Sequence, residues 1–276
     1  MKDFTHLDWR FNIDSRIKIV LICSVLLLQT NFNYAQEIST RDWLISGSGL
    51  GLALGLELYG KSHFVPETPR LSSPNSFDRY MRDKIWVGVN KQDGARAWSD
   101  RLIYGVSMSS LLWGPLLAED TELALLVNTR VFAANSIMTN IAKIAAARER
   151  PYSYFQTRES EGKKDYTSFY SGHSSVAFSQ AVANSMILSR SYPQHESLIW
   201  STLLSTAGVT ALLRVGGDMH YFTDILTGAL SGSLIAWWVT RAELKKQGIY
   251  EREVKTSLHM QGTGSNIVLY LKIPLG

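Results

Sequence analysis

Apolar residues gather in six segments that are long enough for helices, and Gly, Pro, Ser and charged residues separate them. The polar stretches 60–100 and 152–170 are typical of loops. We therefore predict an all-α fold with a six-helix bundle core. The apolar segments cover residues 43–58, 101–118, 122–147, 174–190, 197–214 and 222–247.

Strand-like alternation is scarce until the end of the chain. There, residues 253–261 and 266–273 flank a Gly-Thr-Gly-Ser turn signal, a pattern that predicts a short β-hairpin. We divide the chain accordingly into a helical domain over 36–250 and a C-terminal extension over 251–276 that carries the hairpin.

The first 35 residues have the features of a secretory signal peptide. Arg16 and Lys18 precede the apolar run 19–28, and a polar stretch then leads to Ala35. An uncleaved anchor is the alternative, although the run is shorter than the about 20 apolar residues that a full span needs. We expect an exported protein of the periplasm or cell envelope.

The later helices leave two relations to a membrane open. Their uncharged runs are mostly shorter than the about 20 residues of a spanning helix. The mean hydropathy of −0.04 is also low for a chain made mostly of spanning helices. These features favour a soluble or membrane-associated protein over an integral one.

Charge and cysteine content exclude some classes of partner. The formal net charge is only +4, and no basic run is long enough to suggest nucleic-acid binding. The single cysteine, Cys23, lies inside the predicted signal peptide. We see no cluster of His, Cys and Asp with zinc-ligand spacing, so we expect neither a metal nor a cofactor.

A first candidate segment for chemistry runs from Lys143 to Arg150-Pro151. The two cations are seven positions apart, so on a helix they would lie on nearly the same face. That helix should stop before Pro151. Two cations at a helix end suit an anion, whereas the alternative is a solvated basic face that also includes Arg148.

The second segment is Ser171-Gly172-His173, a turn that leads into an apolar helix with Ser174 or Ser175 as its N-cap. Backbone N–H groups at such a junction can bind a phosphate oxygen. The alternative is a capped turn without a ligand.

The third segment contains Arg214, a Gly pair, His220 and Asp224. On a helix, His220 and Asp224 would share a face, because they are i and i+4. A carboxylate there can hold the imidazole in one tautomer. The alternative is a His–Asp pair that only satisfies itself at a helix surface.

Together the three segments resemble the acid phosphatase signature of the type 2 phosphatidic acid phosphatase and vanadium haloperoxidase superfamily. That signature reads K-x-x-x-x-x-x-R-P, then P-S-G-H, then S-R-x-x-x-x-x-H-x-x-x-D. Two positions depart from it, which puts substrate preference and rate in doubt. Tyr170 replaces the Pro of the second segment, and Leu213 replaces the Ser that precedes the Arg of the third. The matching residues are Lys143, Arg150, Pro151, Ser171, Gly172, His173, Arg214, His220 and Asp224.

The resemblance implies a helical bundle of that superfamily and a role for each matching residue. His220 would be the nucleophile, Asp224 would orient it, and His173 would serve as acid and base. The phosphate would be bound by Lys143, Arg150, Ser171, Gly172 and Arg214.

We therefore expect a metal-independent phosphomonoesterase that works through a phosphohistidine, with a broad-specificity envelope acid phosphatase as the first hypothesis. Its partner would be a phosphorylated small molecule or lipid, with contact to a membrane surface as a further expectation. Alternatives are a membrane lipid phosphatase acting on phosphatidate, isoprenyl diphosphate or lipid A phosphate, a vanadium haloperoxidase, and a non-catalytic phosphate-binding or structural protein.

Overall fold

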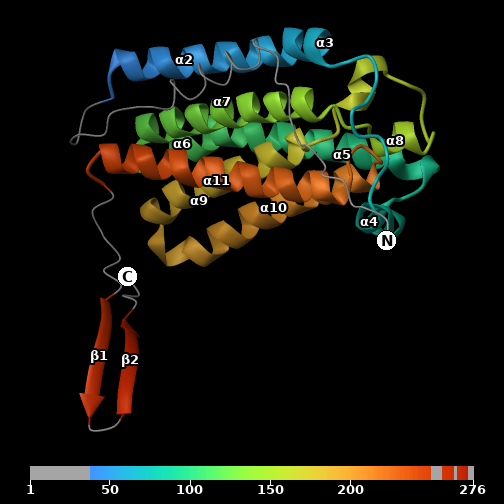
Figure 1. Cartoon of the computed structure of the whole chain (residues 1–276). Coiled ribbons are helices and arrows are strands. Elements are labelled where there is room, and N and C mark those ends of the chain that lie inside the picture. The colour runs from blue at the N-terminus through green and yellow to red at the C-terminus, as the bar shows by residue number, and fades with distance from the viewer. Residues whose placement is uncertain (1–37, 250–256, 264–265, 273–276) are drawn as a thin grey trace, which may run out of the picture. The chain divides into compact units, whose positions relative to one another are not determined.

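The computed structural model describes residues 38–249, 257–263 and 266–272 (Figure 1). The predicted signal peptide lies outside these residues. The chain divides into two compact units, one that includes residues 38–240 and one that includes residues 241–276.

Long helices build the first unit, as the apolar pattern predicts. Within the described residues, six helices have 16 residues or more, which confirms the all-α fold and its six-helix core. They are α2 (Thr40–Gly55), α5 (Val89–Met108), α7 (Thr121–Ala146), α9 (Gly172–Ser191), α10 (Glu196–Gly216) and α11 (Phe222–Lys246), the last of which continues into the second unit.

Shorter helical pieces occupy the segments that we predicted to be polar loops. A loop over the whole of 60–100 is wrong, because α4 and the first half of α5 lie there. The short elements are η1 (Leu56–Gly60), α3 (Lys61–Phe64), α4 (Ser76–Ile85), η2 (Ser109–Trp113), α6 (Gly114–Leu117), α8 (Pro151–Tyr154), η3 (Gly162–Tyr166) and η4 (Pro193–His195).

Helix α9 is central, since it packs against α5, α7 and α10. Small side chains allow this close packing: Ala177 and Ala181 of α9 meet Ile103 of α5 and Ala207 of α10 in one buried cluster. On another side of α7, α2 lies alongside it (Figure 1). The burial of these apolar faces is the main stabilising term of the bundle.

Two glycines of α11 allow this helix to touch the beginning of α9. A Cβ on Gly228 would lie 2.7 Å from the backbone oxygen of Ser171, and one on Gly232 would lie 2.2 Å from that of Ser175. Both distances are too short for any larger residue. The contact therefore fixes the position of the turn that carries Ser171, Gly172 and His173.

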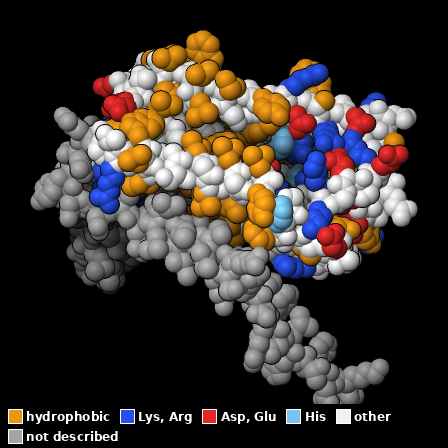
Figure 2. Space-filling model, turned by 90° about the horizontal axis from the view of Figure 1, so that it is seen from above, with side chains coloured by type: hydrophobic (Ala, Val, Ile, Leu, Met, Phe, Trp, Pro, Cys, Tyr) orange, Lys and Arg blue, Asp and Glu red, His pale blue; other side chains and the backbone are white. Residues whose placement is uncertain are grey.

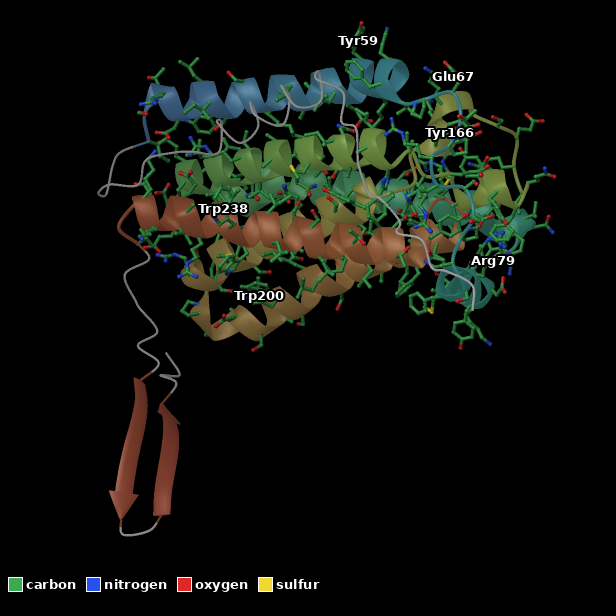
Figure 3. The ribbon with its side chains drawn as sticks, in the orientation of Figure 1. Tyr59, Glu67, Arg79, Tyr166, Trp200 and Trp238 are labelled. Carbon is green, nitrogen blue, oxygen red and sulfur yellow. The ribbon has the colours of Figure 1, made fainter. Side chains whose placement is uncertain are left out.

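The end of α7 and the beginnings of α9 and α11 meet at one end of the bundle (Figure 1). Helices α4 and α8 lie at the same end. In Figure 3, Arg79 marks α4, Tyr166 marks the end of η3, and Glu67 marks the segment between α3 and α4. The three candidate segments are thus brought to one place by the topology.

The second unit contains the predicted hairpin. Strand β1 (Ser257–Thr263) pairs antiparallel with β2 (Asn266–Lys272), with Ser257 opposite Lys272 and Thr263 opposite Asn266. The hairpin prediction is confirmed, although its turn lies outside the described residues.

Apolar side chains are widely exposed on the helical part of the surface, whereas charged side chains and histidines gather at one end (Figure 2). Two stretches, Pro193–Gly216 and Phe222–Lys246, are long and apolar enough to cross a membrane by length and composition. This agrees with an association with membranes. Exposed apolar residues on α10 and α11 include Leu198, Val209, Leu212, Leu226, Leu230 and Leu234.

Candidate active site

Lys143 is buried in the last turn of α7. Its Nζ donates a hydrogen bond to the backbone oxygen of Thr167 at 2.6 Å. The helix ends just beyond it, because Ala147 takes a left-handed conformation with a φ of 41°. Burial and the nearby charges of Arg150 and Lys61 hold the pKa of Lys143 well below its ordinary value. An ammonium group with so little compensation is suited to bind an anion.

Arg150 lies near Lys143, as predicted, but the two residues are not on one helix. It is the N-cap of α8 with an extended backbone, so it does not share a helical face with Lys143. Its Nε donates to the backbone oxygen of Lys164 at 3.0 Å, and its Nη2 donates to Oγ1 of Thr167 at 3.1 Å. Thr167 therefore contacts both cations, and the loop before α9 holds them together.

Arg148 is buried, so the alternative prediction, a solvated basic face that includes Arg148, is wrong for this residue. Its Nη2 donates to Asp78 Oδ2 at 2.7 Å and its Nη1 to Asp224 Oδ1 at 2.5 Å. The guanidinium also lies over the ring of Tyr221, 4.3 Å from its centroid. Arg148 supports the site from behind and does not line the cavity described below.

The predicted turn at the beginning of α9 is present, with a different N-cap. Ser171, and neither Ser174 nor Ser175, is the N-cap of α9, and its side chain accepts from the N–H of Ser174. The N–H of Ser171 itself donates to the backbone oxygen of Asp224 at 3.1 Å. The turn is thereby tied to the first turn of α11.

The two positions that depart from the signature have different surroundings. Tyr170 is buried, and its hydroxyl accepts from Oγ of Ser231 at 3.1 Å, a second link between the turn and α11. Leu213 lies on α10 beside Arg214 and supplies no hydroxyl group.

His220 is buried in the turn between α10 and α11, and it precedes α11 instead of lying on it as predicted. Its Nδ1 lies 2.7 Å from the backbone oxygen of Ser168. A carbonyl oxygen can only accept, so Nδ1 carries the hydrogen and Nε2 has a free lone pair. Burial and the nearby charge of Arg150 hold the pKa of His220 well below its ordinary value, which keeps the ring neutral.

Asp224 acts on His220 through an intermediate residue. Its Oδ2 lies 3.8 Å from Nδ1 of His220, beyond hydrogen-bond distance. The same oxygen accepts from Oγ of Ser168 at 2.6 Å and from the N–H of Tyr221 at 2.9 Å. Asp224 therefore fixes Ser168, and the backbone oxygen of Ser168 fixes the imidazole.

His173 and Arg214 share a partner that the sequence did not indicate. Oδ1 of Asp100, on α5, lies 2.8 Å from Nε2 of His173 and 2.9 Å from Nη1 of Arg214. Burial, and next the charge of Arg214, lowers the pKa of His173 to about 4. The guanidinium of Arg214 is itself buried, and its Nε has no hydrogen-bond partner among the described residues.

A cavity of about 930 Å³ joins these groups. One side is polar and cationic, and the other is formed by apolar residues of α2, η1, α5, α7 and α9. Ser171 and Asp224 lie behind the wall, fully buried. The predicted residues that line the cavity are Lys143, Arg150, Gly172, His173, Arg214 and His220.

The described residues contain no group of three or more His, Cys, Asp or Glu side chains that could hold a metal ion. The site instead concentrates buried cations around two histidines. Such an arrangement can stabilise the charge of a phosphoryl group and offer it a nucleophile, as phosphoryl transfer requires.

The comparisons with known proteins agree with this chemistry. The family model of the PAP2 superfamily matches residues 124–247, a stretch that includes all eight predicted site residues. This part of the chain belongs to the PAP2 superfamily, and the protein is a phosphatase.

A transmembrane PAP2-type phosphatidylglycerolphosphate phosphatase from Bacillus subtilis is among the solved structures that the chain resembles. The identity is 19%, the alignment covers 81% of this chain and 93% of that chain, and the TM-score is 0.40.

Proposed function

We propose that the protein hydrolyses phosphate monoesters through a phosphohistidine formed on Nε2 of His220. The observation that carries the proposal is the state of this ring: it is buried and neutral, and Nδ1 is committed to Ser168. A histidine nucleophile needs this tautomer, because the attacking nitrogen must have a free lone pair.

In the first step, Nε2 of His220 attacks phosphorus while the bond from phosphorus to the ester oxygen breaks. His173 gives a proton to the departing oxygen. Lys143, Arg150 and Arg214 bind the equatorial oxygens, and the Gly172 amide at the N-terminus of α9 adds a further donor. These cations supply the charge stabilisation that phosphoryl transfer requires.

In the second step, water attacks the phosphorus of the phosphohistidine. His173, now neutral, takes the proton of the water as the N–P bond breaks. Orthophosphate leaves, His220 returns to its neutral form, and His173 is again protonated. The two histidines therefore have different requirements: His220 must be neutral when it attacks, and His173 must gain or lose a proton in each half of the cycle.

We further propose that the substrate carries an apolar tail, which favours the lipid phosphatase over the soluble acid phosphatase. The cavity continues from the cationic residues to an apolar wall that includes Ile103, Phe132 and Val176. Leu58 and Tyr104 line the same cavity and are 77% and 71% exposed. An apolar mouth that opens onto an apolar surface suits a lipid phosphate.

To test the nucleophile, the protein is mixed with a labelled phosphate monoester and the reaction is quenched rapidly without acid, so that a phosphohistidine is trapped. We expect label on the wild-type protein and none on His220→Ala, which should also lose turnover. His195→Ala is the matched control, because His195 is exposed and does not line the cavity. Label on His220→Ala at the wild-type level would contradict the assignment.

The test of the tail compares a long-chain alkyl phosphate in mixed micelles with a soluble aryl phosphate. Leu58→Ser should lower kcat/KM for the alkyl phosphate roughly tenfold more than for the aryl phosphate. The bound alkyl tail would cover the exposed Leu58, and removing a leucine side chain from water contributes about 1.5 kcal/mol. Leu44→Ser is the control, because Leu44 is exposed on α2 outside the cavity. Equal losses for both substrates would favour the soluble acid phosphatase.

A further inference from the structure

Asp100 lines the cavity of the candidate site. It is not part of the signature, and it lies outside residues 124–247, which the family model matches. It projects from α5 into the cavity, which His173 and Arg214 also line. One of its oxygens, Oδ1, contacts both of these side chains, at 2.8 and 2.9 Å. It is the carboxylate that directly contacts a histidine of the site, since Asp224 is separated from His220 by 3.8 Å.

The contact determines which nitrogen of His173 can exchange protons. A carboxylate is an acceptor, so Nε2 of His173 carries a hydrogen in both charge states of the ring. Nδ1 is then the nitrogen that donates to the leaving oxygen when the ring is charged and accepts from water when it is neutral.

The two histidines are thus held by different kinds of acceptor. His220 donates to a neutral backbone carbonyl, which fixes the tautomer and adds no negative charge. His173 donates to a carboxylate, which fixes the tautomer and also stabilises the imidazolium. This difference matches the proposed tasks, because a nucleophile must remain neutral and a general acid must be protonated.

We propose that Asp100 is the positioning residue of the general acid: it holds His173 with Nδ1 toward the reaction and stabilises its protonated form. The inference rests on the proposed function, since it assigns His173 the leaving-group proton. Asp100 acts through the imidazole and through Arg214, and it does not itself exchange a proton with the substrate.

The electrostatic surroundings of His173 make the contribution of Asp100 large. Arg214 on α10, Lys143 on α7 and the α5 carboxylate are the charged groups that act on its ring. Burial and the two cations lower the pKa of His173, and Asp100 alone among these groups raises it. Removal of the carboxylate should therefore lower the pKa of His173 further and leave less of the acid form at any given pH.

The experiment compares Asp100→Asn with wild type over a series of aryl and alkyl phosphates of different leaving-group pKa. For poor leaving groups we expect kcat to fall by about 10- to 100-fold, by analogy with the loss that follows removal of the carboxylate partner of a metal-bound imidazole. For activated leaving groups the loss should be small. KM should stay constant or fall, because Arg214 no longer pairs with a carboxylate and is free to bind the phosphate. The alkaline limb of the kcat/KM profile should move to lower pH, because the pKa of His173 is lower in the variant.

The control is Glu161→Gln, which removes one negative charge from the same cavity. Glu161 pairs with Arg96 at 3.1 Å and has no contact with either histidine. Glu161→Gln should change neither the dependence of kcat on the leaving group nor the position of the alkaline limb of kcat/KM. Asp100→Glu should recover part of the activity toward poor leaving groups, since it restores the carboxylate.

Two negative results remain distinguishable. If Asp100→Asn loses equal activity for all leaving groups and its pH limb stays in place, Asp100 is only structural and the inference is overturned. If the wild-type protein forms no phosphohistidine, the proposed function itself fails, whatever Asp100→Asn does.

Discussion

Nη2 of Arg148 and Oδ2 of Asp78 lie 2.7 Å apart in the interior of the protein, although 70 positions separate them in the sequence. Asp78 also accepts from the N–H and the Oγ1 of Thr223, at 2.9 and 2.8 Å. One carboxylate of α4 thus ties the segment after α7 to the beginning of α11. Lys143 lies in the last turn of α7, just before the first of these segments, and His220 lies in the turn just before the second.

Asp78→Asn should therefore destabilise the fold. The substitution leaves the buried Arg148 with a weakened partner, and breaking a buried ion pair costs about 3 kcal/mol or more. Denaturant unfolding, followed by circular dichroism, measures the loss. Asp83→Asn on the same helix is the control, because Asp83 is exposed and should change stability by less than about 0.5 kcal/mol. A similar small change for both variants would show that the pair contributes little.

The pH dependence of catalysis should reflect the low pKa of His173. The general acid must be protonated, so kcat/KM should fall as pH rises through the pKa of His173, which is about 4 in the free enzyme. A bound phosphate dianion raises this pKa, so the corresponding limb of kcat should lie at higher pH. The measurement is a pH profile of both constants with an alkyl phosphate, corrected for the ionisation of the substrate. A kcat/KM that stays flat from about pH 4 to 6 would contradict the assignment of His173 as the acid.

Thr167→Val should weaken phosphate binding. The substitution removes the Oγ1 that accepts from Arg150, while the backbone oxygen that holds Lys143 remains. A hydrogen bond to a charged group is worth about 1.5 kcal/mol, so the inhibition constant of orthophosphate should rise roughly tenfold. Thr206→Val on α10 is the control, since its hydroxyl bonds only to the backbone oxygen of Thr202. An unchanged inhibition constant would mean that Arg150 does not need Thr167 for its orientation.

Gly232→Ala should lower both stability and turnover. The new Cβ would lie 2.2 Å from the backbone oxygen of Ser175, so α11 must move away from the first turn of α9, which carries His173. Overpacking of this kind costs about 1–3 kcal/mol. The thermal midpoint and kcat report the two effects. Gly208→Ala is the control, because a Cβ there meets nothing within 4 Å, and it should stabilise α10 by about 0.5–1 kcal/mol. Equal midpoints for the two variants would count against the close contact.

Local spacing and the resemblance to a known signature were enough to predict which residues of three separate segments belong to the site. Lys143, His173, Arg214 and His220 line one cavity, as the three segments together suggested. Their hydrogen-bond partners could not be predicted in the same way. Asp100, the partner of His173 and Arg214, comes from a helix far away in the sequence, and an isolated Asp in a polar stretch looks like any solvated residue.

The predicted boundaries failed where tertiary contacts override local composition. The first half of α5 is polar, and we therefore predicted a loop. It is helical because its polar residues have buried partners: the Gln92 side chain donates to the backbone oxygen of Thr157 at 2.9 Å, and Ser99 donates to that of Thr210 at 3.1 Å. Such bonds become visible only when α8 and α10 are in place.

The two-sided cavity has a consequence for the fate of the products. Under the proposed function, the dephosphorylated alcohol stays with the apolar wall near Leu58 and Tyr104, where it can partition into a lipid phase. Orthophosphate remains with the cations and leaves toward water. The two products are thus held by different parts of the cavity. Orthophosphate, which the buried cations hold, should therefore inhibit hydrolysis more strongly than the alcohol does.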